Sequence, residues 1–126
     1  MFSIRTPLLL CALILSAPAF AGRDTRHDTA MTTLATKAGC LTCHSVHTTS
    51  DSSETPIGPA WQDVAARYHG QKGAAAQLAQ TVQDGSNPYQ AHWKNKATGL
   101  AMPPNAVAIN KTDTRKLVDW ILTLDQ

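Results

Sequence analysis

The sequence predicts one small all-α domain, and three observations support this. Apolar residues recur at the three- and four-residue spacing of an amphipathic helix in four separate segments. No segment shows the alternation expected of a strand, and no stretch repeats along the chain. The third observation is length, because 105 of the 126 residues remain once a predicted N-terminal signal is removed, which is enough for one domain.

The first 21 residues have the three parts of a secretory signal peptide. Arg5 lies near the start, an apolar run extends from Leu8 to Leu15, and Ala19-Phe20-Ala21 offers a small-x-small cleavage site. The apolar run is shorter than the roughly 20 residues of a membrane span, and Cys11 lacks the small preceding residue that lipid attachment favours. We therefore expect cleavage after Ala21 and a periplasmic domain, 22–126, without stable membrane insertion.

The first helix is predicted from about Thr29 to Ala38, after a polar segment, 22–28, that we expect to be loose. Gly39 is well placed to end this helix directly before a cysteine motif. Residues 45–56 are rich in serine and threonine and predict a surface loop. The apolar positions of the helix are Met31, Leu34, Ala35 and Ala38.

Three further helices follow. A short helix is predicted from Pro59 to Tyr68, and another from about Gly73 to Asp84, ending at Gly85. Residues 86–109 contain several prolines and no periodicity, which is typical of a long segment that binds something or is disordered. The last helix is predicted from an Asn110 N-cap to about Leu124. Its buried stripe is expected to contain Leu117, Trp120, Ile121 and Leu124.

Composition limits the possible functions. Loss of Arg5 with the signal leaves ten basic and nine acidic residues, a net charge of +1, which does not suggest a nucleic-acid partner. The mature chain has only five aromatic residues and many alanines, so its core would be thin. A bulky apolar cofactor would fill such a core.

The motif AGCLTCHSVH, residues 38–47, allows three kinds of site. A structural zinc site needs four ligands, usually as two close pairs, and the remaining histidines of the mature chain form no second pair. A redox-active dithiol normally lies in a βαβ setting, which this chain does not offer. Covalent haem attachment requires Cys-x-x-Cys-His in an exported protein. The motif therefore favours a haem held by Cys40 and Cys43, with His44 as an axial ligand.

The second axial ligand separates an electron carrier from a catalyst. Met102 precedes Pro103 and Pro104, which stiffen the backbone as a weak thioether ligand requires. Met31 is expected in the core of the first helix, and His47 is too close to His44 in the chain. His69 and His92 are expected at the surface, and ligation by His92 is the main competing hypothesis.

Four sequence features together resemble a class I cytochrome c of the small monohaem bacterial type. They are AGCLTCH, Ile57-Gly58-Pro59-Ala60-Trp61, Met102-Pro103-Pro104-Asn105 and the closing LVDWILTL, and they span about Thr29 to Leu124. The resemblance implies the class I fold, with about four helices around one covalent haem and crossed N- and C-terminal helices.

The resemblance also implies roles for single residues. Cys40 and Cys43 would form the thioether bonds, and His44 and Met102 would be the axial ligands. The Pro59 carbonyl would accept the His44 Nδ1 proton. Asn105 would lie near the Met102 sulfur, and Trp93 would bond a haem propionate. The sequence departs from the compact family pattern in its long 45–56 loop and in its Trp93-to-Met102 spacing.

The expected function is that of an electron carrier rather than an enzyme. With both axial positions occupied, the iron can only gain and lose an electron. We expect transient redox partners, a monomer and no nucleic-acid binding. The alternatives are a haem subunit of a periplasmic dehydrogenase, a high-spin haem enzyme or gas-binding protein, and a haem-free disulfide or zinc module. Lysines that could surround a docking site are Lys37, Lys72, Lys94, Lys96 and Lys111.

Overall fold

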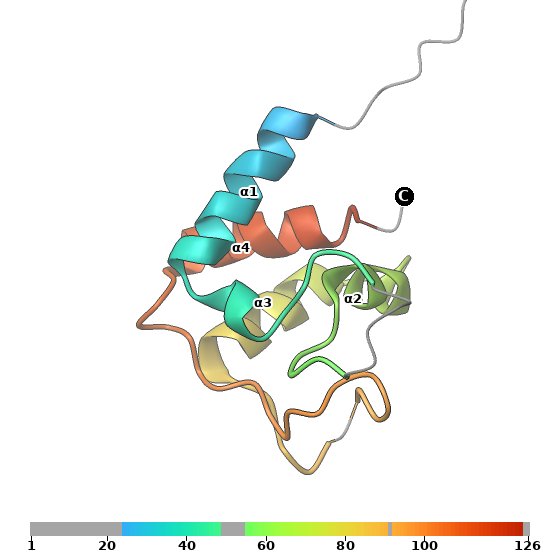
Figure 1. Ribbon diagram of the computed structural model, residues 1–126. Helices are drawn as coiled ribbons and strands as arrows, with labels where there is room; N and C mark the ends of the chain where they lie inside the picture. Colours follow the sequence, from blue (N-terminus) through green and yellow to red (C-terminus); the bar gives the residue numbers. More distant parts are fainter. Residues whose placement is uncertain (1–23, 49–54, 91, 125–126) are drawn as a thin grey trace, which may run out of the picture.

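The computed structural model describes residues 24–48, 55–90 and 92–124. The expected signal peptide, with its cleavage site, and the middle of the 45–56 loop lie outside the described residues. The described part contains the helices α1 (Thr25–Lys37), α2 (Trp61–Tyr68), α3 (Ala74–Asp84) and α4 (Lys111–Ile121), and one 3-10 turn, η1 (Cys40–Thr42). It contains no strand, so the all-α prediction is confirmed (Figure 1).

Helix α1 begins four residues earlier than the sequence predicted. The Asp24 side chain accepts a hydrogen bond from the Arg26 backbone N–H at 3.0 Å and so caps the helix. Asp28 places an acidic group in the first turn, where the helix dipole favours it. Most of residues 24–28 are exposed and polar. The prediction of a loose 22–28 segment is therefore wrong for residues 25–28, because apolar spacing does not reveal a solvent-exposed first turn.

The other helices lie close to their predicted positions. Helix α2 begins at Trp61, because Ala60 is still extended. In α4 the predicted Asn110 cap is confirmed, with its side chain accepting from the Asp113 N–H at 2.9 Å. Helix α4 ends at Ile121, and the chain continues as a turn to Leu124.

Helices α1 and α4 cross and form most of the core (Figure 1). The Trp120 indole of α4 lies edge-on to Trp61 of α2, with ring centroids 5.8 Å apart and an interplanar angle of 83°. The Trp120 Nε1–H also donates to the Asp28 carboxylate of α1 at 2.7 Å. One side chain thus links three helices. The buried core cluster is Met31, Ala35, Trp61, Ala65, Ile109, Leu117, Trp120, Ile121 and Leu124.

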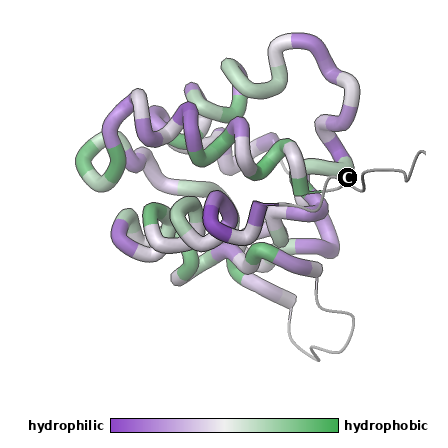
Figure 2. The backbone as a smooth tube through the Cα atoms, turned by 90° about the horizontal axis from the view of Figure 1, so that it is seen from above, coloured by the Kyte–Doolittle hydropathy of each residue, from purple (hydrophilic) through white to green (hydrophobic). Residues whose placement is uncertain are grey.

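Hydrophobic and hydrophilic residues are interspersed along every helix, as Figure 2 shows. Within the described residues, none of the helices combines the length and the apolar character needed to cross a membrane. The predicted place of Met31 in the core is confirmed, since its side chain is buried between α1 and its neighbours.

The bond between Trp120 and Asp28 should contribute measurably to stability. Replacing Trp120 with Phe removes the indole donor, and a hydrogen bond to a charged group contributes about 1.5–3 kcal/mol. We expect Trp120→Phe to lower the free energy of unfolding by at least that amount in denaturant titrations. Asp28→Asn keeps an acceptor oxygen and should cost less than Trp120→Phe. An equal free energy of unfolding for Trp120→Phe and wild type would show that this hydrogen bond does not stabilise the packing of α1 against α4.

Candidate functional site

A cavity of about 620 Å³ lies between the helices and the irregular segment before α4. Its volume is within the range of about 300–1,000 Å³ that is usual for ligand sites. Its apolar wall includes Leu78 and Val82 of α3. They are only half-buried because they face this cavity. The apolar side chains that α4 contributes to the wall are Leu117, Val118 and Ile121.

The cysteine motif folds into one tight turn beside this cavity. Gly39 has a φ of 75°, in the left-handed region, and it turns the chain between the end of α1 and the cysteine motif. The turn is closed by the His44 N–H, which donates to the Cys40 carbonyl at 3.1 Å. Cys40, Cys43 and His44 therefore all line the cavity, as the sequence motif requires of residues that share one cofactor.

The His44 ring is held in one tautomer. Its Nδ1 lies 2.8 Å from the Pro59 carbonyl oxygen, which can only accept a hydrogen bond, so Nδ1 carries the proton. Burial lowers the pKa of His44, while the bond to Pro59 opposes that shift. A neutral imidazole with Nε2 unprotonated is the form that binds metal ions. The bond expected between His44 and Pro59 is thus present in this structure.

Two neighbours of His44 had no role assigned from the sequence. The Gly58 backbone lies against the ring, and a Cβ added at Gly58 would be 2.6 Å from His44 Cε1. The Trp61 indole stacks on the imidazole, with centroids 5.8 Å apart and planes 26° from parallel. Both residues belong to the Ile57–Trp61 run. The family resemblance included this run, but it did not show that Gly58 and Trp61 contact the His44 ring.

The described surroundings of the two cysteines give no support to the two competing kinds of site. Burial raises the pKa of the Cys40 thiol, whereas catalytic dithiols have a lowered pKa. Among the described residues, no group of three or more His, Cys, Asp or Glu side chains could hold a metal ion. A structural zinc site, which needs four ligands, therefore finds no support in this part of the chain.

Met102 lines the same cavity from the irregular segment and is half-buried. Its backbone N–H donates to the Ser86 hydroxyl at 2.8 Å, and its carbonyl accepts from the Ser86 N–H at 2.9 Å. His92, the competing ligand, also lines the cavity but is exposed. One cavity thus brings together His44 and both candidates for the second axial position.

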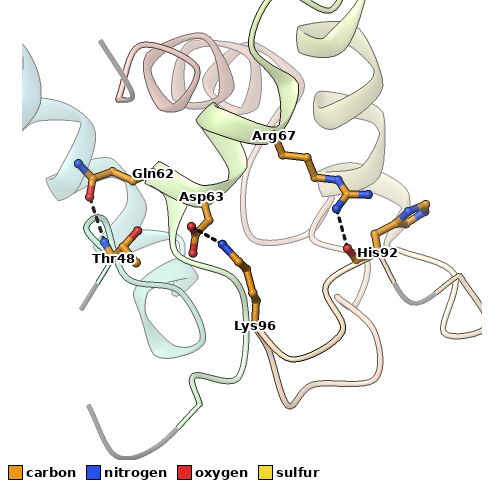
Figure 3. Close-up of polar contacts among 6 residues, drawn as sticks. All are labelled: Thr48, Gln62, Asp63, Arg67, His92 and Lys96. Carbon is orange, nitrogen blue, oxygen red and sulfur yellow. Dashed lines mark hydrogen bonds and ion pairs between the residues drawn. The ribbon is translucent and has the colours of Figure 1, made fainter. Parts of the chain in front are cut away.

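Trp93 lines the cavity. Beside it, side chains of α2 hold the irregular segment, as Figure 3 shows for Arg67 with His92 and Asp63 with Lys96. The Arg67 guanidinium lies 5.0 Å from the centre of the Trp93 ring, a cation–π contact, and donates to the His92 carbonyl at 2.8 Å. Lys96 forms an ion pair with Asp63 at 2.8 Å. The same face of α2 also holds the start of the long loop, because the Thr48 N–H donates to the Gln62 side chain at 3.0 Å. The contact with Arg67 holds Trp93 in the cavity wall. A hydrogen bond from Trp93 to a haem propionate stays a prediction.

Asn105 is the one predicted site residue that does not line the cavity among the described residues. Its side chain donates to the Pro103 carbonyl at 2.6 Å, and its backbone N–H donates to the Val82 carbonyl at 3.0 Å. Asn105 thus stabilises the turn that follows Met102. Its position beside the Met102 sulfur stays a prediction.

The sequence and the fold can be compared with those of known proteins. A sequence profile of the family Cytochrome c matches residues 30–125. Cytochrome c-551 of Pseudomonas aeruginosa is 40% identical over 85 residues, which cover 68% of this chain and 67% of that protein. Cytochrome c-552 of Nitrosomonas europaea is 38% identical over 91 residues, covering 72% and 75%. The crystal structure of wild-type Nitrosomonas europaea cytochrome c552 matches 74% of this chain and 98% of that one, at 36% identity and a TM-score of 0.56.

The family implies a covalently bound haem c, and the residues present are suited to one. Cys40 and Cys43 fit the attachment motif Cys-x-x-Cys-His, and the neutral His44 ring is a suitable iron ligand. The apolar wall of the cavity supplies the environment that a macrocycle requires. From the sequence profile, the relatives and the shared fold, we conclude that this chain belongs to the cytochrome c family, among its small monohaem bacterial class I members.

Proposed function

We propose that the protein is a periplasmic electron carrier, whose haem is joined to Cys40 and Cys43 and bound axially by His44 and Met102. The observation that carries the proposal is that all four side chains line one cavity. The haem would supply a one-electron couple at its iron. The chain would supply two axial ligands and an apolar surrounding, and it would need no catalytic residue.

The contacts around His44 support its role as the first axial ligand. Three neighbouring residues restrain the ring: the Pro59 carbonyl accepts its Nδ1 proton, the Gly58 backbone lies against it, and the Trp61 indole stacks on it. A hydrogen bond from Nδ1–H makes Nε2 a better donor to a metal and prevents the ring from rotating. The ligand is therefore oriented before the metal binds, which keeps its geometry similar in both redox states.

Met102 would leave no open position on the iron, so the protein would exchange electrons without binding oxygen or peroxide. A thioether ligand in an apolar cavity favours ferrous iron and raises the reduction potential. Trp93, held under Arg67, would bond a propionate, and Asn105 would lie near the Met102 sulfur. Both roles follow the family resemblance and the places of these residues beside the cavity and its ligand turn.

The partners proposed are redox proteins that bind transiently to a monomeric carrier. Ile57 and Leu100 line the cavity, and yet they are 54% and 87% exposed. Apolar side chains at such a position suit a small interface that forms and separates quickly. Lys94 also lines the cavity, whereas the Lys96 ammonium already pairs with Asp63. Export with a signal peptide cleaved after Ala21 would deliver the mature chain, 22–126, to the periplasm.

The ligation by Met102 can be tested with a matched pair of variants. We expect the ferric holoprotein to show a methionine-to-iron charge-transfer band in the far red. Met102→Leu should abolish this band and allow the ferrous protein to bind carbon monoxide without denaturation. Met31→Leu should retain the band, because Met31 lies in the helical core, where swaps that conserve volume usually cost less than about 1.5 kcal/mol. Attached haem without the band in wild type would favour His92 as ligand, or an open coordination site.

The contact of Gly58 with the His44 ring gives another prediction. A Cβ at this position overlaps the imidazole, and such overpacking typically costs about 1–3 kcal/mol. We expect Gly58→Ala to lower the free energy of unfolding by that amount. It should also accelerate exchange of the His44 Nδ1 proton, measured by NMR of the ferrous protein.

Gly70→Ala is the control for this experiment. Gly70 has a φ of 68° and no atom near its added Cβ, so its substitution costs stability through backbone strain alone. Exchange of the His44 Nδ1 proton should be unchanged in Gly70→Ala. Equal exchange rates in Gly58→Ala and wild type would contradict a role of Gly58 in placing the ring.

A further inference from the structure

Ser86, two residues beyond the last residue of α3, binds both backbone polar groups of Met102. Its hydroxyl accepts from the Met102 N–H at 2.8 Å, and its own N–H donates to the Met102 carbonyl at 2.9 Å. The two residues are 16 positions apart in the sequence. A reciprocal pair of this kind fixes the position and the direction of a backbone unit, and not only its distance from α3.

Gly85 allows this close approach. Its φ of 84° is in the left-handed region, and an added Cβ would lie 2.9 Å from the Met102 carbonyl oxygen and 3.0 Å from the Pro104 nitrogen. The ligand segment thus passes close to the residue that follows α3. The sequence predicted Gly85 only as a helix stop.

The same end of α3 holds the residues that follow Met102. The Val82 carbonyl accepts from the Asn105 N–H at 3.0 Å. The Gln83 side chain donates to the Ile109 carbonyl at 3.0 Å and to the buried Thr114 hydroxyl at 2.7 Å. Hydrogen bonds with α3 therefore fix the position of the segment 102–109, and the prolines of that segment stiffen its backbone.

Pro103 and Pro104 have no backbone N–H, so they cannot donate hydrogen bonds to the rest of the protein. The nearest donors on either side are the N–H groups of Met102 and Asn105, and α3 together with Ser86 accepts both. Of the two contacts, only the one to Met102 uses a side chain. It is the one that a single substitution can remove.

We propose that Ser86 is a positioning residue for Met102, which holds the Met102 backbone so that the thioether stays directed into the cavity. The inference rests on the proposed function, because it matters only if Met102 binds the iron. Without the Ser86 hydroxyl, the half-buried Met102 N–H loses its acceptor, and the ligand-bound arrangement loses stability relative to the detached one. The protein then exposes its iron to competing ligands more often.

The test is a titration of the ferric holoprotein with imidazole, which competes with methionine for iron. The far-red charge-transfer band reports the bound methionine. Loss of the acceptor for a half-buried N–H should raise the apparent affinity for imidazole by about five- to a hundred-fold in Ser86→Ala. Ser86→Thr retains a hydroxyl and should remain nearer to wild type than Ser86→Ala.

Thr98→Val is the matched control, because it removes another hydroxyl from the same irregular segment. The Thr98 hydroxyl donates to the Pro56 carbonyl at 3.3 Å and is exposed. Its loss should change the imidazole affinity less than about two-fold, since exposed hydrogen bonds contribute little. An equal rise in Thr98→Val and Ser86→Ala would mean that general loosening of the segment, and not the Ser86 bond, controls Met102.

The outcomes separate this inference from the proposed function. If wild type shows the band and Ser86→Ala binds imidazole as wild type does, the role of Ser86 is refuted while Met102 ligation stands. If wild type has attached haem but no band, Met102 ligation fails, and the inference fails with it. If Ser86→Ala does not accumulate as holoprotein, amide hydrogen exchange in the wild-type protein tests whether the Met102 N–H is hydrogen-bonded. The Met102 N–H should exchange at least about ten-fold more slowly than that of exposed Ala101, and equal rates would refute the bond.

Discussion

The hydrogen bond from His44 to the Pro59 carbonyl is the contact on which the site depends. It sets the tautomer of the ring, and it joins the cysteine turn to the segment that leads into α2. Backbone bonds reinforce this junction, since the Gly58 N–H donates to the Cys43 carbonyl at 2.8 Å and the Trp61 N–H to the Ser45 carbonyl at 2.9 Å. The Trp61 indole then stacks on His44 and lies nearly perpendicular to the Trp120 indole. The crossed helices α1 and α4 are thus connected to His44 through two indoles.

The two sides of the proposed iron site are built in different ways. The histidine side starts from a local motif turn, which places two cysteines and the imidazole together, and adds the bond to Pro59, 15 residues further along the chain. The methionine side has no such local turn, and it depends on contacts between the end of α3 and the segment around Met102, such as that of Ser86 with Met102 across 16 residues. Closing a chain over such distances costs conformational entropy, and hydrogen bonds and stiff prolines offset that cost. We expect the methionine side to open first when the protein is destabilised.

Residues with local signals were the ones that could be predicted. The motif, the Asn110 cap and the apolar stripe of α4 were visible because spacing and residue type are enough to define them. The start of α1 was missed, since an exposed polar turn has no periodicity and depends on the Asp24 cap. Gly58 and Ser86 carry no local signal for their contacts. Their importance comes from what the fold places beside them, an imidazole in one case and a methionine backbone in the other.

The most direct test of the account is to observe the two methionines of the mature chain separately. Ferrous holoprotein labelled with ¹³C at the methionine methyl groups would be studied by NMR, with Met31→Leu used for assignment. A methyl group held against the haem face experiences a strong ring-current shift. We predict that the Met102 methyl resonance lies far upfield of the ordinary range while that of Met31 lies within it. Both methyl resonances within the ordinary range would contradict the axial role of Met102, and with it the proposal of an electron carrier that has no open coordination site.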